Sequence, residues 1–267
     1  MNMGVTASLL ASDEARATSD ESRAVIRAPH APETAPAKRR VVHHLFSTIA
    51  PRYDWFNRLA SLNLDGWWRR RAVAIGQLRG SMRVLDVCSG TGDLALLCAK
   101  ALREDGLVVG VDFTWPMLQG ALRKQQAQGA RVSWLEGDAL SLPFAADSFD
   151  RVFIGFSTRN LTVLRDGLRE MLRVVRPGGQ VIILETGRPS NPIVRAGYEL
   201  FLGTVVRAIG LLLTGRLWPF TYLARSVAGF LSPAEFVALL RDCGAEARYL
   251  PLSFGLASVY LATKPSL

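Results

Sequence analysis

The sequence has few cysteines, few lysines and no charge-free apolar run of the usual membrane-spanning length. Its three cysteines form no C-x-x-C pair and no metal-ligand spacing, which indicates a reducing compartment and predicts no metal site. Lysine occurs only at positions 38, 100, 124 and 264, so arginine supplies most of the net charge of +9. The most apolar stretch, residues 199–216, is interrupted by Arg207, whereas a span needs roughly 18 or more uncharged residues. We therefore predict a cytoplasmic protein that could lie peripherally on a membrane.

No internal repeat and no recognised RNA-binding module occurs either. A pI near 10.1 is compatible with nucleic acid, an anionic membrane surface or anionic substrates. Without a module for base stacking, we expect no nucleic-acid partner. The sequence does not determine the oligomeric state, and a homodimer is compatible with it.

Composition divides the chain into an extension and one domain. Residues 1–38 are rich in Ala, Ser, Glu, Arg and Pro, which predicts a disordered extension. Residues 39–267 form the predicted domain, which begins with two or three short helices over residues 39–80.

Strand and helix patterns then alternate along the chain. Buried strands are predicted over residues 82–87, 106–112, 131–138, 149–156 and 180–185. Helices are predicted over 93–103, 115–127 and 163–175, with Pro-Gly-Gly ending the last, and a hairpin closes the chain. This alternation predicts an α/β fold with a doubly wound, mostly parallel sheet that binds ligands at the carboxyl ends of its strands.

Residues 84–95, VLDVCSGTGDLA, combine an apolar strand, an acid and a glycine turn that leads into a helix. Gly90 and Gly92 let a ligand approach the main chain closely, and Asp112 follows about 20 residues later, where an acid commonly binds a ribose. Because the pattern G-x-G-x-x-A also fits a nicotinamide dinucleotide, an NAD-dependent enzyme is an alternative at this point.

Charge favours a different ligand. Asp86 at the strand tip and Asp93 at the helix start would repel a diphosphate, which prefers the positive end of a helix. S-adenosylmethionine has no phosphate but carries a sulfonium and an ammonium group, so these carboxylates favour it. Asp138 and Ala139 follow the third strand, where an acid and a backbone N–H can contact an adenine edge, although Asp138 alone would be typical of a turn.

From about residue 41 the chain resembles class I methyltransferases, and more narrowly the C-methyltransferases of menaquinone and ubiquinone biosynthesis. The resemblance rests on FSTIAPRYDWFN, VLDVCSGTGDLA, GDALSLPFAADSFD, RNL, GLREMLRVVRPGGQVIILE and YLARSV. It implies a seven-stranded sheet, S-adenosylmethionine as cofactor and an isoprenoid quinol as substrate. The predicted donor-binding residues are Asp86, Gly90, Thr91, Gly92, Asp112, Asp138 and Ala139, of which Thr91, Asp112, Asp138 and Ala139 are carried over from the family.

The resemblance also implies that Tyr53, Arg159 and Asn160 act on the substrate. Arg159 is a fixed cation suited to a phenolate oxygen, Asn160 can orient the ring, and Tyr53 can relay a proton directly or through water. Simpler interpretations stay open: Arg159 as a surface ion-pair partner, Asn160 as the cap of the following helix and Tyr53 as a core residue. His43 and His44 are further candidate bases, but adjacent residues on a helix point in different directions.

The chain departs from the family pattern near the expected substrate side. Where the family has Met, an aliphatic residue and His, this chain has Phe56, Ala60 and Asp65. A serine usual at the end of the fourth strand falls on Gly155, so its donor contact is absent or is made by Ser157. The remaining departures are Thr158, Arg176 and Gly187. They leave the cofactor and the reaction type in place but leave the quinone undetermined.

Residues 190–232 mix apolar faces with arginines, which suits a helical lid that accommodates a polyprenyl tail and lies on an anionic membrane. The alternative is a helical cap packed on the core. The predicted reaction is C-methylation of demethylmenaquinol to menaquinol, with the benzoquinol step of the ubiquinone pathway as an alternative. A methyltransferase for another lipid or aromatic molecule, an RNA methyltransferase and a non-catalytic donor-binding protein stay open.

Overall fold

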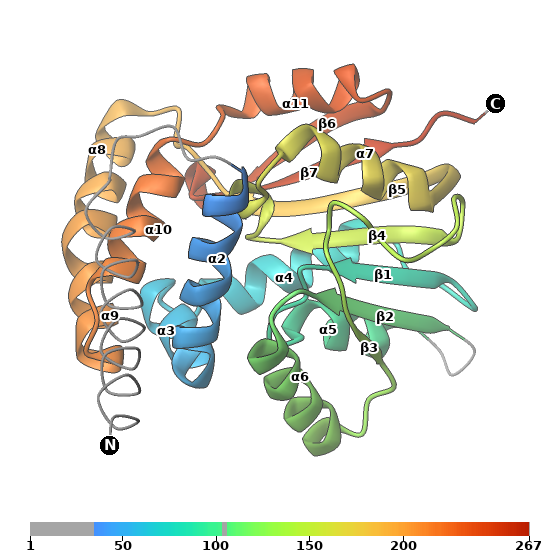
Figure 1. The fold of residues 1–267 in the computed structure, drawn as a ribbon. Helices are drawn as coiled ribbons and strands as arrows, with labels where there is room; N and C mark the ends of the chain where they lie inside the picture. The colour runs from blue at the N-terminus through green and yellow to red at the C-terminus, as the bar shows by residue number, and fades with distance from the viewer. Residues whose placement is uncertain (1–34, 103–105, 267) are drawn as a thin grey trace, which may run out of the picture.

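The computed structural model describes residues 35–102 and 106–266 (Figure 1). The extension predicted over residues 1–38 therefore lies outside the described residues, except for its last four. Those four residues begin helix α2, Ala35–Ile49.

A seven-stranded sheet forms the centre of the molecule, with the strand order β3-β2-β1-β4-β5-β7-β6. The strands from β3 to β5 pair in parallel, while β7 runs antiparallel to both β5 and β6. The prediction of a mostly parallel, doubly wound sheet with a closing hairpin is confirmed. The strands are β1 Arg83–Val87, β2 Leu107–Asp112, β3 Ser133–Glu136, β4 Phe149–Gly155, β5 Val175–Thr186, β6 Glu246–Leu252 and β7 Ala257–Thr263.

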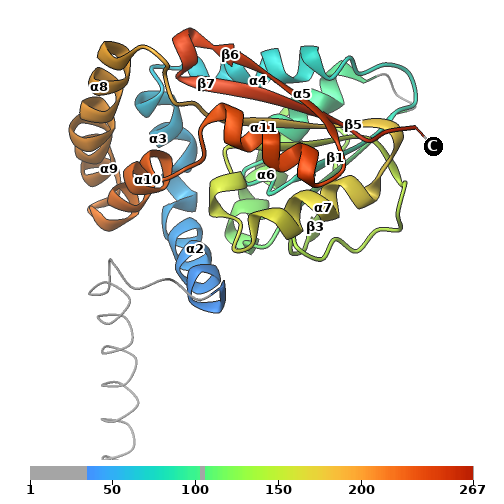
Figure 2. The ribbon, with the colours of Figure 1, turned by 90° about the horizontal axis from the view of Figure 1, so that it is seen from above.

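Helices cover both faces of this sheet (Figures 1 and 2). Alternate residues of β1 point to opposite faces, so Leu85 and Val87 join one core and Val84 joins the other. The core of Leu85 packs under α7, Leu164–Val174, and α11, Pro233–Asp242. The core of Val84 packs under α4, Leu64–Ile75, and α5, Asp93–Ala101.

A separate group of helices lies at the carboxyl ends of β1 and β4, toward which their arrowheads point (Figure 1), and Figure 2 shows it beside the sheet. A third apolar core, which includes Phe56, Val206 and Phe220, holds these helices together and reaches Met117 on α6, Trp115–Gln128. The group comprises α2, η1 Ala50–Arg52, α3 Tyr53–Ala60, α8 Pro192–Phe201, η3 Leu202–Val206, α9 Arg207–Thr214 and α10 Trp218–Ala228.

Two expectations about local structure were wrong. Pro-Gly-Gly does not itself end α7, because the helix already stops at Val174 and the chain pairs at once as β5, with an irregularity in register opposite Phe149. Residues 192–214 form one helical run of 23 residues, with mean hydropathy 1.5, that is long and apolar enough to cross a membrane. The core helix of a soluble protein can pass the same test of length and composition, but such a helix is mostly buried, whereas 11% of this apolar window is buried.

Candidate functional site

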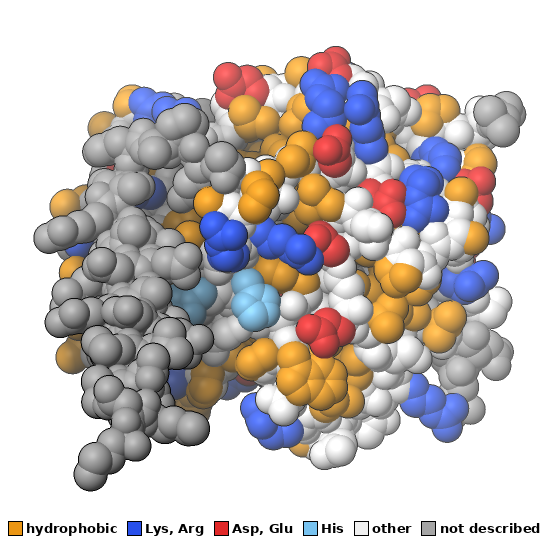
Figure 3. All heavy atoms as spheres, in the orientation of Figure 1, with side chains coloured by type: hydrophobic (Ala, Val, Ile, Leu, Met, Phe, Trp, Pro, Cys, Tyr) orange, Lys and Arg blue, Asp and Glu red, His pale blue; other side chains and the backbone are white. Residues whose placement is uncertain are grey.

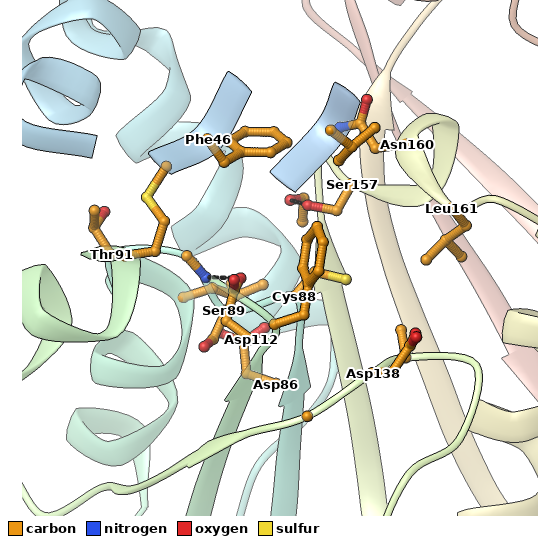
Figure 4. A pocket seen from close by; sticks show the side chains of 18 of the residues that line it. Phe46, Asp86, Cys88, Ser89, Thr91, Asp112, Asp138, Ser157, Asn160 and Leu161 are labelled. Atoms are coloured by element: carbon orange, nitrogen blue, oxygen red, sulfur yellow. Dashed lines mark hydrogen bonds between the residues drawn. The ribbon is translucent and has the colours of Figure 1, made fainter. Parts of the chain in front are cut away.

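A cavity lies where β1, β2 and β4 end, and we call it the strand-end cavity (Figure 4). It encloses about 930 Å³ of empty space, its open mouth included. Side chains from the strand ends and from α2 face one another across it (Figure 4). Of the predicted donor-binding residues, those that line it are Asp86, Gly90, Thr91, Asp112, Asp138 and Ala139.

Asp112 fixes the glycine turn of the cavity. One of its carboxylate oxygens accepts a hydrogen bond from the backbone N–H of Gly90 at 2.8 Å, and the other accepts one from the N–H of Thr114 at 2.9 Å. Burial raises the pKa of Asp112 to about 6, although both backbone N–H groups oppose that rise. Gly90 has a φ of +55°, and a side chain there would enter open space, so the backbone is bare where a ligand would approach.

Gly92, which we also predicted to bind the donor, does not line this cavity. Its φ is +83°, and a Cβ atom there would lie 2.6 Å from the Trp134 ring and 2.9 Å from Ala121. The glycine is therefore required for close packing of the turn against β3 and α6.

Asp86 is a buried carboxylate at the floor of the cavity. It is 1% exposed, and no side chain of the described residues donates a hydrogen bond to its oxygens, although the backbone N–H of Ala95 lies near enough to favour the ionised form. Burial raises the pKa of Asp86 to about 8. A buried acid of this kind is stabilised as a carboxylate when a cation lies beside it. The site thus has the feature that a positively charged ligand requires.

The Asp86→Asn variant should be more stable than the wild type at pH 8, by about 1–3 kcal/mol. Because the pKa of Asp86 rises from 3.8 in the unfolded chain to about 8 in the folded one, its contribution to the free energy of unfolding falls as pH increases between those values. The asparagine cannot ionise and removes this loss. Urea unfolding at pH 5 and pH 8 measures the effect, with the exposed Asp242→Asn as control. Equal stabilisation at both pH values would contradict the assignment.

Asp93, which we expected to contribute an unpaired negative charge, is compensated by Lys124. The Lys124 ammonium lies 2.5 Å from Asp93 and 2.7 Å from Asp54, and it donates to the Thr91 hydroxyl at 3.0 Å. Thr91 in turn donates to Asp54 at 2.6 Å. This network ties α3 to α5 and α6. This network could not be predicted from the sequence because Lys124 lies 31 positions after Asp93, in another helix.

Replacing Lys124 by methionine should lower the free energy of unfolding by about 1–3 kcal/mol, because Asp54 and Asp93 would face each other in a partly buried site without a cation. Thermal unfolding tests this expectation. Lys100→Met, an exposed lysine on α5, is the matched control and should have almost no effect. Equal effects of the two substitutions would exclude a structural network at Lys124.

The N-terminal helix α2 covers the mouth of the cavity. Arg39 forms an ion pair with Asp138 at 3.2 Å, while Lys38 donates to the backbone carbonyls of Leu161 at 2.8 Å and of Arg159 at 3.3 Å. Asp138 also accepts from the N–H of Leu140, as its interpretation as a turn residue predicts. Helix α2 is therefore joined both to the end of β3 and to the loop that carries Arg159.

A second cavity of the same size lies among the helices, and we call it the helical cavity. Its walls are mainly apolar, with Phe56, Leu202 and Phe220 among them. Four residues line both cavities, and they mark the place where the two meet. These shared residues are Phe46, Tyr53, Arg69 and Asn160.

Arg159 lines the helical cavity in a buried ion pair with Glu185, not in a surface one. Its Nη1 also donates to the carbonyl of Phe156 at 2.7 Å, whereas its buried Nε has no partner among the described residues. Glu185 is fully buried and accepts from the hydroxyl of Thr158 at 2.6 Å. Glu185 was not among the residues predicted from the sequence, where it is a single acid at the end of the buried strand QVIILE.

Asn160 and Tyr53 meet at the junction of the cavities. The Asn160 side chain does not cap α7, whose preceding residue is Val163, and its carbonyl lies 3.4 Å from the Tyr222 hydroxyl. Burial raises the pKa of Tyr53, although Asn57 and the nearby arginines oppose that effect. Tyr53 is therefore a neutral phenol near pH 7. Tyr53 also packs edge-on against Phe46, as its alternative interpretation as a core residue predicts.

The two candidate histidines lie elsewhere. His43 and His44 are exposed on α2, and neither lines either cavity. Histidine side chains appear on the outer surface of this face in Figure 3. His43 packs edge-on against Phe113 and His44 stacks on Trp218, so both serve the contact of α2 with its neighbours. Ser157 does line the strand-end cavity beside Gly155, where the family usually has serine.

A model of the ubiE/COQ5 methyltransferase family matches residues 34–264 of the chain. The chain belongs to the ubiE/COQ5 methyltransferase family. It is an S-adenosylmethionine-dependent methyltransferase, which decides between the two ligands that the glycine turn left open. The buried Asp86 and the bare backbone at Gly90 fit this cofactor, which combines positive charge with a need for close approach.

Similar proteins agree with this assignment. The chain is 40% identical to a demethylmenaquinone methyltransferase of Thermus thermophilus over 83% of this chain and 100% of that protein. It is 39% identical to one of Deinococcus radiodurans over 85% of this chain and 94% of that protein. Both alignments span nearly the whole length of the relative.

Solved structures share the fold. A SAM-dependent methyltransferase from Aquifex aeolicus matches with a TM-score of 0.57 and 19% identity, over 78% of this chain and 97% of that one. The [4+2]-cyclase SpnF matches with a TM-score of 0.63 and 18% identity, over 85% and 96% of the two chains. Because a cyclase shares the fold, the fold alone does not determine the reaction.

Proposed function

We propose that this protein transfers a methyl group from S-adenosylmethionine to a ring carbon of an isoprenoid hydroquinone, with demethylmenaquinol as the substrate. The observation that carries the proposal is that a cavity lined by several carboxylates meets a mainly apolar one at Tyr53 and Asn160. The first would hold the donor and the second the ring and its prenyl tail. The names of the relatives at about 40% identity support the naphthoquinol.

The donor supplies a methyl group that its sulfonium already activates. The protein must align that methyl with the ring carbon and make the ring electron-rich. Arg159, held rigidly by Glu185, would stabilise negative charge developing on the quinol oxygen. Asn160 would orient the hydroxyl, and Tyr53, a neutral phenol, would donate to that oxygen or relay its proton to water.

Incubation with labelled donor tests the proposal. The acceptors are a short-chain demethylmenaquinol, the corresponding demethylated benzoquinol and total RNA. We expect label in the naphthoquinol, with a product heavier by one methyl group in mass spectrometry. Label in the benzoquinol alone would identify the benzoquinol, and not the naphthoquinol, as the substrate. Label in RNA alone would refute the proposal.

The same proposal includes peripheral contact with an anionic membrane. The run from α8 to α9 exposes apolar side chains, including Ile193 at 81% and Leu212 at 85%. Arg216 and Arg225 are exposed beside it. Apolar residues flanked by arginines suit the interface of an anionic bilayer, from which a prenylated substrate would enter the helical cavity.

The double variant Ile193→Glu/Leu212→Glu should bind vesicles of anionic phospholipid at least about tenfold more weakly than the wild type, because two carboxylates would enter the apolar part of the interface. Co-sedimentation with such vesicles measures this. Leu122→Glu, on α6, introduces the same charge on another exposed apolar residue and should bind as the wild type does. Undiminished binding of the double variant would place the contact elsewhere.

A further inference from the structure

Arg69 is a buried cation at the junction of the two cavities. It lies on α4, is 7% exposed and lines both cavities. Its Nη1 is paired with Asp65, and its guanidinium carbon lies 5.3 Å from the centre of the Phe156 ring. The hydrogen bond to Asp65 engages only Nη1 of the guanidinium, and the nearby charge of Asp93 also acts on Arg69.

Asp65 holds this arginine in place. It lies four residues earlier on α4 and is itself held by Ser61, whose hydroxyl donates to the Asp65 carboxylate at 3.0 Å. Asp65 stands where the family usually has histidine. The structure gives this departure a role, because a carboxylate at this position anchors Arg69 with a charge-assisted hydrogen bond.

Arg69 and the buried Asp86 belong to the same face of the sheet. Strand alternation places Asp86 on the face of Val84, which α4 and α5 cover, and Arg69 projects from α4. The positive charge of Arg69 acts on Asp86 and favours its ionised form. A carboxylate and a guanidinium therefore lie near each other along the wall of the strand-end cavity.

The amino acid head group of S-adenosylmethionine carries an ammonium and a carboxylate on one carbon, which matches this pair of charges. We infer that Arg69 binds the carboxylate of that head group, while Asp86 faces its ammonium. Arg39, the other cation among the described residues that line this cavity, is largely exposed and already paired with Asp138. Arg159 lies in the helical cavity and is already paired with Glu185.

The test compares S-adenosylhomocysteine with the analogue that lacks only its carboxylate, 5′-deoxy-5′-(3-aminopropylthio)adenosine, by titration calorimetry. Wild-type protein should bind the amino acid form about tenfold to a hundredfold more tightly, as expected for a buried charge-assisted hydrogen bond. The double variant Asp65→Asn/Arg69→Gln leaves no Asp65 carboxylate without its partner. In this variant the ratio of the affinities for the two ligands should fall to about threefold or less, while the affinity for the analogue stays as in the wild type. Because no quinol is present, the outcome is independent of the proposed substrate.

Two further variants complete the experiment. Arg69→Lys keeps the charge but loses the planar fork, so it should retain part of the preference for the carboxylate. Arg70→Gln makes the same substitution at the next, exposed residue of α4 and should keep the full preference. The inference is overturned if the double variant keeps the wild-type ratio, or if it loses both ligands to the same extent.

Discussion

Replacing Arg159 by glutamine should lower kcat for quinol methylation by about two to three orders of magnitude, because the buried site loses the charge that opposes the developing phenolate. The KM for S-adenosylmethionine should change little, since Arg159 lines the helical cavity and not the strand-end cavity. Steady-state kinetics with each substrate varied in turn separate these two effects.

The single variant leaves Glu185 buried without its cation, so part of its effect could come from misfolding. The double variant Arg159→Gln/Glu185→Gln removes both charges, so that neither is left buried without its partner. It should fold, bind the donor product normally and show the same loss of kcat. Near-normal kcat in the folded double variant would exclude Arg159 from the chemistry.

Replacing Tyr53 by phenylalanine should lower kcat by about a hundredfold, because the ring still packs against Phe46 but the hydroxyl at the junction is lost. Binding of S-adenosylhomocysteine and the thermal midpoint should stay close to those of the wild type. A purely structural role for Tyr53 predicts the opposite pattern, with a lower midpoint and preserved kcat.

Tyr249→Phe provides the matched control for that variant. Tyr249 is 43% exposed on β6 and stacks on Tyr260, away from both cavities. The same loss of a hydroxyl there should leave kcat unchanged. Equal losses in both variants would contradict a specific role for the hydroxyl of Tyr53.

The sheet and the donor side of the site could be predicted from sequence because both depend on local pattern. Val/Ile-rich runs define β1 and β4, and the spacing from Gly90 to Asp112 follows from one strand–helix–strand unit. Asp112 does lie beside the glycine turn, through a hydrogen bond to it. These contacts connect neighbouring strands, so their geometry is set by the fold itself.

The charge partners could not be predicted, because they join segments remote in sequence. Lys124 reaches Asp54 from a helix about 70 residues away, and Glu185 meets Arg159 across the ends of two strands. Whether a carboxylate is free or paired depends on such contacts. Asp93 and Asp86 look alike in the sequence, yet Asp93 is neutralised and Asp86 is not.

Backbone strain at the site could not be predicted from the sequence either. Cys88 and Phe156 follow β1 and β4, and both have positive φ values, +53° and +57°, that side chains rarely adopt. The carbonyl of Phe156 accepts from Arg159 at 2.7 Å. The strained turn thus helps to place Arg159, which is consistent with strain stored where function requires a fixed geometry.

The central claim is that the two cavities hold donor and quinol in contact at Tyr53 and Asn160. A crystal structure of the protein with S-adenosylhomocysteine and a short-chain demethylmenaquinol tests it most directly. We expect the sulfur of the donor product at the junction, the quinol ring facing it and the prenyl chain among the apolar side chains of the helical cavity. A quinol bound outside the helical cavity, or a donor product bound away from Gly90 and Asp86, would contradict it.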